Sequence, residues 1–333
     1  MQTDLQKATF AEIQTGNGAL REASFSHPSR VVSIRIENFE SGGLVDSQLV
    51  TQVLITSLLS GVVYGSVGLA FVTVYRVTSL INFPQADIGL AGALAAAAFG
   101  GGAWSAGLFI AALVSAAVSA AMFLLVVVPL RRATVLLQTI ALIGAGIALQ
   151  AIMQMLVGTG PRSLAPFVHG SPIMINGAAF PLQGLFVLGW GAILLVGLHV
   201  FFEKTMLGRA VRACAINPYA AGLVGIPVMV MSFVAYVIAG LISGLAITVQ
   251  APLSYLTVSA GLALALKGFI AAAIGGGERI VACMGAGLLL GILEGLVILW
   301  FPIAFQQIVV MLALLTVLML RPSGIGRRAG HGV

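Results

Sequence analysis

Charged side chains are scarce in this sequence. Only 8% of its 333 residues are Asp, Glu, Lys or Arg, whereas 59% are hydrophobic. Soluble domains carry roughly 25% charged residues, and a surface with far fewer charges does not stay dispersed in water. The scarcity therefore excludes an ordinary soluble domain and indicates a protein that crosses a membrane several times.

Metal-binding and catalytic residue patterns are also missing. Neither Cys214 nor Cys283 has a second cysteine or a histidine at ligand spacing, and the four histidines are scattered, so no metal site and no cofactor are predicted. The chain has no Gly-x-x-x-x-Gly-Lys-Ser/Thr loop and is not expected to bind ATP itself. No nucleic-acid partner is expected either. An intramembrane enzyme would need a catalytic cluster at membrane depth. His199 and Glu203, four residues apart near a span end, are more typical of an interfacial salt bridge.

Long uncharged runs separate the few charges. These runs do not alternate apolar and polar residues as the strands of a membrane barrel do, so they are expected to be helices, which satisfy their own backbone in lipid. At about 20 residues for each crossing, the sequence predicts an all-α, polytopic transmembrane bundle of about 8–10 spans. The predicted spans are roughly 49–75, 79–99, 105–130, 134–158, 184–202, 227–250, 261–276, 282–299 and 303–320.

The positions of Lys and Arg predict the orientation. If residues 203–226 are cytoplasmic and the spans alternate outward from them, Arg162 is the only basic residue of the short loops that lies outside. Nine spans then leave the N-terminus outside and the C-terminus inside. The arginines predicted to be cytoplasmic are Arg76, Arg131, Arg132, Arg279, Arg321, Arg327 and Arg328.

The same patterns divide the chain into three regions. Residues 1–47 are a polar extension, either a disordered extracytoplasmic tail or the result of a misassigned start with translation truly beginning near Val45. Residues 48–321 are the predicted transmembrane domain. Residues 322–333 are a short basic cytoplasmic tail.

A basic, Pro-containing segment interrupts the apolar sequence at 203–226. It predicts two short helices, the first at about 203–216 with Arg209 and Arg212 on one face. Asn217 is a good N-cap, with Pro218 at the first position of the second helix, which stops at Gly225. Such a helix pair is either a docking surface for a partner or an anchor for the adjoining span.

Three segments carry a resemblance to a known family. They are "GRAVRACAINPYAAGLVGIP" (208–227), "VYRVTSLINFPQADIGLAGAL" (74–94) and "LKGFIAAAIGGGERIVACMGAGLLLGILEGL" (266–296). The first resembles the cytoplasmic coupling loop, and the other two resemble membrane segments, of the permeases of branched-chain amino acid ABC transporters, the shorter of the two permease types. The three occur in the order of the family and together extend from about residue 50 to 325.

The resemblance implies a permease subunit of an ABC importer in a bacterial or archaeal plasma membrane. The implied partners are a second permease chain, identical or related, two ATPase subunits and an extracytoplasmic solute-binding protein. The implied substrates are branched-chain or other hydrophobic amino acids, with amides, urea or related small solutes as alternatives. A sugar-type permease of the wider superfamily and an ion-coupled secondary transporter are the rival functions. The residues expected to couple to the ATPase are Lys204, Gly208, Arg209, Arg212, Asn217, Pro218, Ala221 and Gly225.

Polar residues inside the predicted spans are candidates for the substrate pathway, because they are costly in lipid and tend to face a cavity or a partner. Pro84 indicates a broken helix, which transporters use to present polar groups to substrate. The candidate pathway residues are Asn82, Phe83, Gln85, Asp87, Lys267 and Glu294. The alternatives are an interfacial position for Asp87, and an ion pair of Lys267 with Asp87 or Glu294 that never touches substrate. Family members usually have Ala-His-Gly and Glu where this chain has Pro84 to Asp87, which leaves the substrate open.

Small residues indicate close helix packing and an internal repeat. The glycines of "GLISGLA" (240–246) and "GAGLLLG" (285–291) lie on one helix face, where they allow neighbouring backbones to approach. "AAAFGGG" (96–102) recurs as "AAAIGGG" (271–277). In the predicted topology the two copies point in opposite directions, as in an inverted repeat. Chance similarity between two Ala- and Gly-rich segments is the alternative explanation.

Overall fold

The structure is a computed structural model that describes residues 47–100, 104–168, 170–276, 280–302 and 304–320. Contacts divide the chain into residues 1–47 and 48–333, and all features below belong to the second unit except Ser47. The predicted polar extension, apart from Ser47, and the predicted basic tail lie outside the described residues. So do Arg279, Arg321, Arg327 and Arg328.

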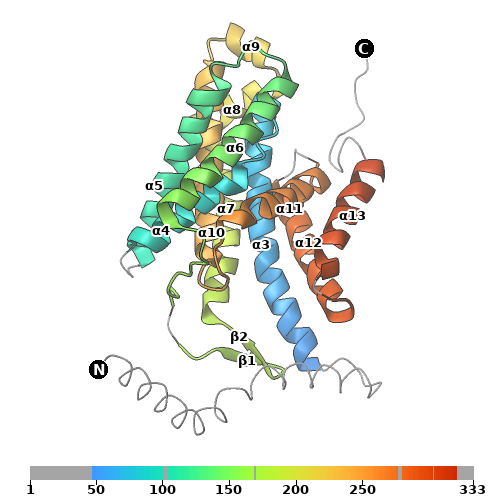
Figure 1. The fold of residues 1–333 in the computed structure, drawn as a ribbon. Helices are drawn as coiled ribbons and strands as arrows, with labels where there is room; N and C mark the ends of the chain where they lie inside the picture. The colour runs from blue at the N-terminus through green and yellow to red at the C-terminus, as the bar shows by residue number, and fades with distance from the viewer. Residues whose placement is uncertain (1–46, 101–103, 169, 277–279, 303, 321–333) are drawn as a thin grey trace, which may run out of the picture. The chain divides into compact units, whose positions relative to one another are not determined.

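The described part of the chain is a helical bundle, which confirms the predicted fold class (Figure 1). Nine apolar helices occupy the nine predicted segments. They are α3 (Ser47–Thr78), α4 (Gln85–Phe99), α5 (Trp104–Met122), which continues into a π-helical turn (Phe123–Val127), α6 (Val135–Val157), α7 (Leu182–Lys204), α10 (Val228–Gln250), α11 (Gly261–Ile274), α12 (Ile280–Trp300) and α13 (Ala304–Leu320).

Six of these helices are long and apolar enough to cross a membrane, namely α3, α5 with its π-helical turn, α6, α7, α10 and α12. Helices α4 and α11 have 15 and 14 residues. At 1.5 Å per residue each is only about 21–23 Å long, against a hydrocarbon core of about 30 Å. The prediction of a span over 79–99 is wrong at its start, because Pro84 has no backbone N–H and the helix begins after it.

The two short helices have matching ends. Helix α4 ends in the first copy of the predicted repeat, where Gly100 N–H donates to Ala96 O at 2.8 Å. Helix α11 ends in the second copy, where Gly275 N–H donates to Ala271 O at 3.0 Å. The φ and ψ angles are −69° and −10° at Gly100 and −65° and −10° at Gly275. The sequence repeat therefore has a local structural counterpart.

Glycines bring the long helices into close contact, as predicted. A Cβ added at Gly287 of α12 would lie 2.2 Å from the backbone nitrogen of Gly65 in α3. One added at Gly240 of α10 would lie 2.6 Å from the carbonyl oxygen of Ser115 in α5. Larger side chains at these two positions would force the backbones apart, so both glycine-rich segments contribute packing contacts. Gly285 does not, because a Cβ there would meet nothing within 4 Å.

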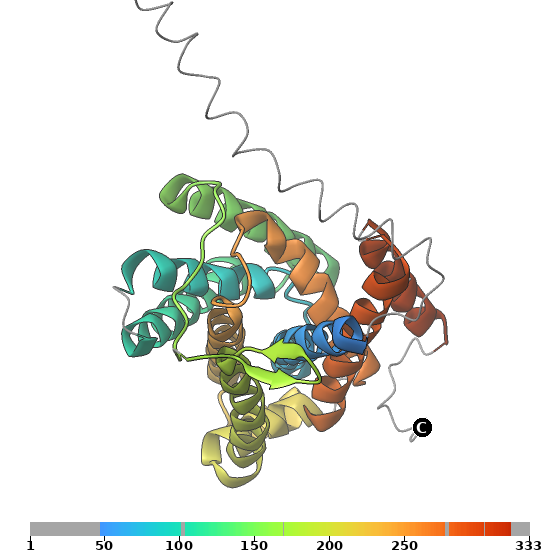
Figure 2. The ribbon, with the colours of Figure 1, turned by 90° about the horizontal axis from the view of Figure 1, so that it is seen from below.

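One end of the bundle carries a two-stranded hairpin, β1 (Ile173–Ile175) and β2 (Ala178–Phe180), which pair antiparallel with Met174 opposite Ala179. The hairpin lies near the start of α3 (Figure 2), where Ala179 N–H donates to Gln52 Oε1 at 2.9 Å. Arg162, which follows α6, pairs its backbone with Leu256, which follows α10.

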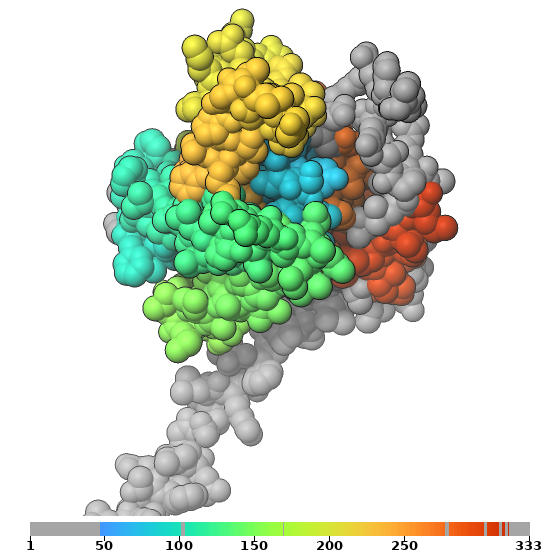
Figure 3. Space-filling model, turned by 90° about the horizontal axis from the view of Figure 1, so that it is seen from above, coloured from blue at the N-terminus to red at the C-terminus, as the bar shows by residue number. Residues whose placement is uncertain are grey.

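The opposite end carries the short helices α8 (Met206–Ile216) and α9 (Pro218–Leu223), which stand out beside the start of α10 (Figure 3). The end of α5 lies there too, because Ser119 Oγ donates to Tyr236 O at 2.6 Å in the first half of α10. Arg131 and Arg132 connect α5 to α6 and so lie at this end. Among the described residues, Arg131, Arg132 and the arginines of α8 are thus separated from Arg162, as the orientation prediction requires.

Candidate functional site

The break before α4 places polar side chains in the interior of the bundle. Asn82 and Gln85 are both buried. Asn82 Nδ2 donates to Gln85 Oε1 at 2.9 Å, and Gln85 Nε2 donates to Ser243 Oγ of α10 at 2.9 Å. Asn82 Oδ1 has no hydrogen-bond partner among the described residues. Two of the predicted pathway residues therefore form one polar chain that joins the break to α10.

Asp87 lies in the first turn of α4 and is only 4% exposed, so its side chain is buried within the bundle. Its Oδ1 accepts a hydrogen bond from Gln150 Nε2 of α6 at 2.9 Å. A Cβ added at Gly261, the first residue of α11, would lie 1.7 Å from the same oxygen. The starts of α4 and α11 therefore meet at one carboxylate.

A second polar cluster joins four helices elsewhere in the bundle. Lys267 of α11 forms an ion pair with Glu294 of α12 and donates to Tyr64 Oη of α3 at 3.1 Å. Gln306 Nε2 of α13 also donates to the Glu294 carboxylate. Of the two partners predicted for Lys267, the structure selects Glu294 and not Asp87. A buried charge with a partner and further hydrogen bonds avoids most of the cost of burial.

The six predicted pathway residues therefore lie in two groups. The Phe83 ring, which is half-buried, contacts the Phe269 ring of α11 with centroids 5.8 Å apart. It brings the break before α4 to the same short helix that carries Lys267. The sequence prediction considered mainly ionisable residues and missed the hydrogen-bond partners of both groups. The detectable signal was a polar amide or hydroxyl within an apolar run, as at Tyr64, Gln150, Ser243 and Gln306.

The basic segment after α7 folds as two capped helices. The first predicted helix began at 203, but α7 continues to Lys204 and α8 starts at Met206. Thr205 Oγ1 caps α8 by accepting from Gly208 N–H at 2.9 Å. Asn217 Oδ1 caps α9 by accepting from Ala220 N–H at 3.0 Å, with Pro218 at the first helical position. The predicted cap at Asn217 is confirmed.

Two predicted coupling residues face inward. Ala221 is 4% exposed, and a Cβ at Gly208 would lie 1.9 Å from the carbonyl oxygen of Phe201. Both small residues therefore pack the helix pair against the rest of the chain. Gly225 follows α9 with φ +85°, a conformation that favours glycine.

The outward surface of the helix pair is basic and apolar. Lys204, Arg209 and Arg212 are exposed. Large apolar side chains of the same segment are exposed as well, and four of them lie at the end of α8, in α9 and just after it, namely Ile216, Tyr219, Leu223 and Val224. Exposed apolar groups that adjoin one another typically mark a surface for a partner. We call these four residues the apolar tip.

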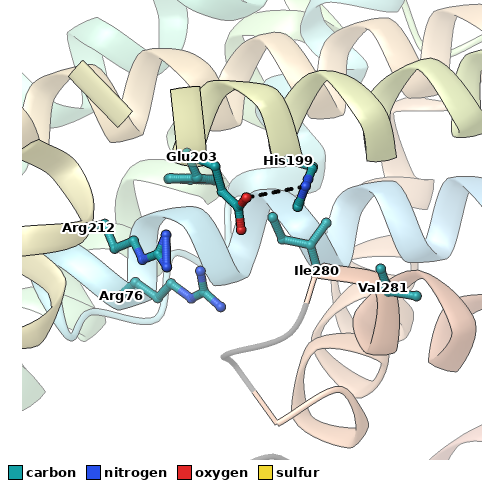
Figure 4. Close-up of a pocket in the computed structure, with 7 residues that line it drawn as sticks. Arg76, His199, Glu203, Arg212, Ile280 and Val281 are labelled. Carbon is teal, nitrogen blue, oxygen red and sulfur yellow. Dashed lines mark ion pairs between the residues drawn. The ribbon is translucent and has the colours of Figure 1, made fainter. Parts of the chain in front are cut away.

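A pocket of about 310 Å³ lies between α3, α7, α8 and the start of α12 (Figure 4). His199 Nε2 and Glu203 Oε2 are 3.4 Å apart along one face of α7, which confirms the predicted pairing of these two residues. Arg212 lines this pocket, so its side chain also faces the bundle. The lining residues are Arg76, His199, Phe202, Glu203, Arg212, Ile280 and Val281.

The family model described as "Branched-chain amino acid transport system / permease component" matches residues 53–319. The chain is 25% identical over 295 residues to the high-affinity branched-chain amino acid transport system permease protein BraD of Pseudomonas aeruginosa, which covers 82% of this chain and 94% of BraD. It is 26% identical over 296 residues to LivH of Escherichia coli (strain K12), with the same two coverages. PsaBC from Streptococcus pneumoniae in complex with Fab, a solved structure, aligns with a TM-score of 0.49 and 14% identity over 86% of this chain and 94% of that chain. Because the matched segment runs from α3 into α13, the chain belongs to the family of branched-chain amino acid transport system permease components.

Proposed function

We propose that this chain is the membrane-spanning permease of an ABC importer for branched-chain or other hydrophobic amino acids. The observation that carries the proposal is a family match that begins in α3 and ends in α13 and so includes every apolar helix. BraD and LivH are both named as high-affinity branched-chain amino acid transport permeases. Amides and urea are the alternative substrates. ATP is hydrolysed by partner chains, and a second permease chain completes the pathway.

Helices α8 and α9 are the proposed contact with the ATPase. They lie outside the six candidate spans, and their exposed surface combines Arg209 with the apolar tip. A basic side chain beside exposed apolar groups suits an ATPase groove that has an acidic rim and an apolar floor. Gly208 and Ala221 face inward and pack this helix pair against the rest of the bundle.

The same end of the bundle is proposed to face the cytoplasm. Arg131, Arg132, Arg209 and Arg212 lie there, whereas Arg162 lies at the hairpin end, and cytoplasmic loops carry the excess of Lys and Arg. The hairpin end then faces outward, toward an extracytoplasmic solute-binding protein.

The substrate pathway is proposed to pass the meeting point of α4 and α11. Broken helices present their ends to substrates near the middle of the membrane in many transporters. Here two helices too short to span meet at Asp87, and Asn82 Oδ1 lies buried nearby in sequence as an acceptor without a partner among the described residues. Lys267 and Glu294, which are paired to each other, are proposed to support the fold around this path.

Co-purification with an ATPase tests the proposed function. The chain is expressed with the neighbouring genes of its own genome and purified from membranes, and ATP hydrolysis and leucine uptake into vesicles are measured. Arg209→Glu and Leu223→Ser should both abolish ATPase association, through charge repulsion and loss of an apolar contact. Tyr255→Ser, an equally exposed site near Leu256 at the hairpin end, should leave it intact.

An ion-coupled transporter would behave differently. Leucine uptake that follows an ion gradient and proceeds without any ATPase chain would overturn the proposal. Uptake of urea or acetamide with no leucine uptake would keep the ABC permease and change its substrate. ATPase association that survives both substitutions would remove the coupling role of α8 and α9.

A further inference from the structure

Within the described part of the chain, the buried carboxylate of Asp87 has no positively charged partner. Helices α5, α6, α10 and α11 pack against α4. Lys267 is the one basic residue within the bounds of these helices, all of which the structure describes, and it is paired with Glu294. It also lies six residues beyond Gly261, about 9 Å along α11. Because an uncompensated charge away from water is costly, Asp87 either keeps a proton or receives a cation from outside these helices.

The two oxygens of this carboxylate have different surroundings. Gln150 Nε2 donates to Oδ1 at 2.9 Å, the single hydrogen bond that the described residues give to the Asp87 side chain. Oδ2 lies beside Gly146 of α6, where an added Cβ would be 3.6 Å away. Glycine has no side chain, so position 146 offers Oδ2 no polar group. The carboxylate is therefore held by one neutral donor and keeps an oxygen for a ligand.

The same break in the helix contains a second oxygen without a donor. Asn82 is 1% exposed, and its Oδ1 accepts no hydrogen bond from the described residues. The nitrogen of the same amide is occupied, because it donates to Gln85 Oε1. A six-residue segment, from Asn82 to Asp87, thus holds two oxygens that lack donors. A ligand that satisfies such oxygens must itself donate hydrogen bonds.

An ammonium group matches these oxygens better than a metal ion does. It carries a positive charge, three N–H donors and no acceptor. Hard metal cations such as Ca²⁺ and Mg²⁺ take about six or more oxygen ligands. The described groups beside the Asp87 carboxylate are the donating nitrogen of Gln150 and the glycines at 146 and 261, which do not provide a shell of oxygens.

The depth of Asp87 in the bundle suits a ligand that enters from the hairpin end. Gln150, the partner of Asp87, is seven residues before the end of α6. Ser243, the partner of Gln85, is seven residues before the end of α10. Seven helical residues extend about 10 Å, and the 23 residues of each of these helices extend about 35 Å. Asp87 therefore lies in the third of the bundle nearest the hairpin, the end proposed to face outward.

We propose that Asp87 binds the ammonium group of the amino acid that is transported. The ammonium donates to Oδ2, while Gln150 holds Oδ1 and fixes the orientation of the carboxylate. This inference rests on the proposed function and adds a chemical requirement to it. The substrate must carry a protonated amine, which urea and acetamide lack. Because an ABC importer takes its energy from ATP and needs no coupling ion, the substrate itself is the cation that reaches the carboxylate.

Ligand binding without the solute-binding protein tests this requirement, because that protein makes its own selection among substrates. The full chain is purified in nanodiscs with the chains that co-purify with it, and saturation-transfer NMR compares three probes at equal concentration. They are L-leucine, isopentylamine, which is leucine without its carboxylate, and isocaproate, which is leucine without its amine. Wild-type protein should bind leucine and isopentylamine and should bind isocaproate much more weakly.

Asp87→Asn removes the charge and keeps an oxygen for Gln150. It should weaken the binding of leucine and isopentylamine about tenfold or more, the loss expected for a charge-assisted hydrogen bond. Glu203→Gln is the matched control, because it removes a carboxylate at the other end of the bundle, where Glu203 contacts His199. This variant should bind all three probes as the wild type does.

The outcomes separate this site from the proposed function. Equal affinities of wild type and Asp87→Asn for leucine would overturn the ammonium site and leave the amino acid permease intact. Absence of leucine binding to wild-type protein would remove amino acids as the substrate and this inference with them. If Asp87→Asn does not fold, the wild-type probes still decide, since isocaproate that binds as tightly as isopentylamine would contradict the proposal.

Two measurements distinguish the ammonium from other cations. Leucine binding that is lost when choline replaces Na⁺ would indicate a metal ion at the carboxylate and would overturn the proposal. Infrared difference spectra between wild type and Asp87→Asn report the protonation of this carboxyl group. A protonated carboxyl signal that persists when leucine is bound would also overturn it, because a neutral acid does not pair with an ammonium.

Discussion

The carboxylate of Asp87 lies directly against the backbone of Gly261, although the two residues belong to different short helices. A Cβ at position 261 would be 1.7 Å from Asp87 Oδ1, which no real side chain tolerates. Gln150 of α6 holds the same oxygen through a hydrogen bond of 2.9 Å. A larger residue at position 261 therefore requires the Asp87 carboxylate to move away from the start of α11.

Gly261→Ala should displace Asp87 and weaken the fold. Overpacking a buried site costs about 1–3 kcal/mol, so we expect a lower thermal midpoint in detergent, measured by intrinsic fluorescence, and reduced uptake. Gly144→Ala in α6 is the matched control, because a Cβ there meets nothing within 4 Å. It should be neutral or stabilise by about 1 kcal/mol. Equal midpoints for both variants would show that Asp87 moves away at little cost.

Asp87→Asn should reduce uptake without loss of the folded protein. Asparagine keeps an oxygen that can accept from Gln150, so the helix junction should survive, whereas the negative charge that the pathway proposal assigns to this position is lost. Transport into vesicles and the yield of monodisperse protein are measured together. Normal uptake would leave Asp87 with a structural role only. A lower yield of folded protein would also indicate a structural role for Asp87.

Lys267→Met should destabilise the bundle strongly, because it leaves Glu294 charged and buried without its cation. Breaking a buried ion pair costs about 3–5 kcal/mol. The double variant Lys267→Met/Glu294→Gln should recover much of this loss, since glutamine is neutral and retains an oxygen for Gln306. The thermal midpoints of the two single variants and the double variant form a double-mutant cycle. Additive losses would contradict the pairing.

Cysteine labelling should report the orientation with little interference from the native thiols. Cys214 and Cys283 are buried, and burial raises the pKa of the Cys214 thiol, which keeps it protonated and unreactive near neutral pH. Because the pKa is raised, labelling of Cys214 should increase only as the pH becomes alkaline. Ile216→Cys should react only with reagents that enter the cytoplasm, and Ser171→Cys with impermeant external ones.

The reverse pattern of labelling would invert the proposed topology and remove the ATPase contact from α8 and α9. Position 216 is a better reporter than position 208, because a side chain at Gly208 would collide with the backbone of Phe201. Ile216 and Ser171 are both exposed.

The sequence by itself determined the membrane class, the nine helical segments, the family and the cap at Asn217. Composition is a property of the whole chain, whereas the length of an apolar run and the backbone chemistry of a cap are local. None of these depends on how the helices pack together. Asn217 followed by Pro218 is a helix start in almost any surroundings, because one supplies the capping oxygen and the other the helical φ angle.

Only the tertiary structure decided which polar groups meet. Lys267 had two possible acidic partners in the sequence, and its choice of Glu294 follows from the packing of α11 against α12. The sequence of α9 does not show that the Ala221 side chain points inward, because the buried side of so short a helix depends on how the helix packs against the bundle. Arg76 and Arg212, more than a hundred residues apart, share a pocket for the same reason: side chains meet through the placement of whole helices, and local sequence does not encode that placement.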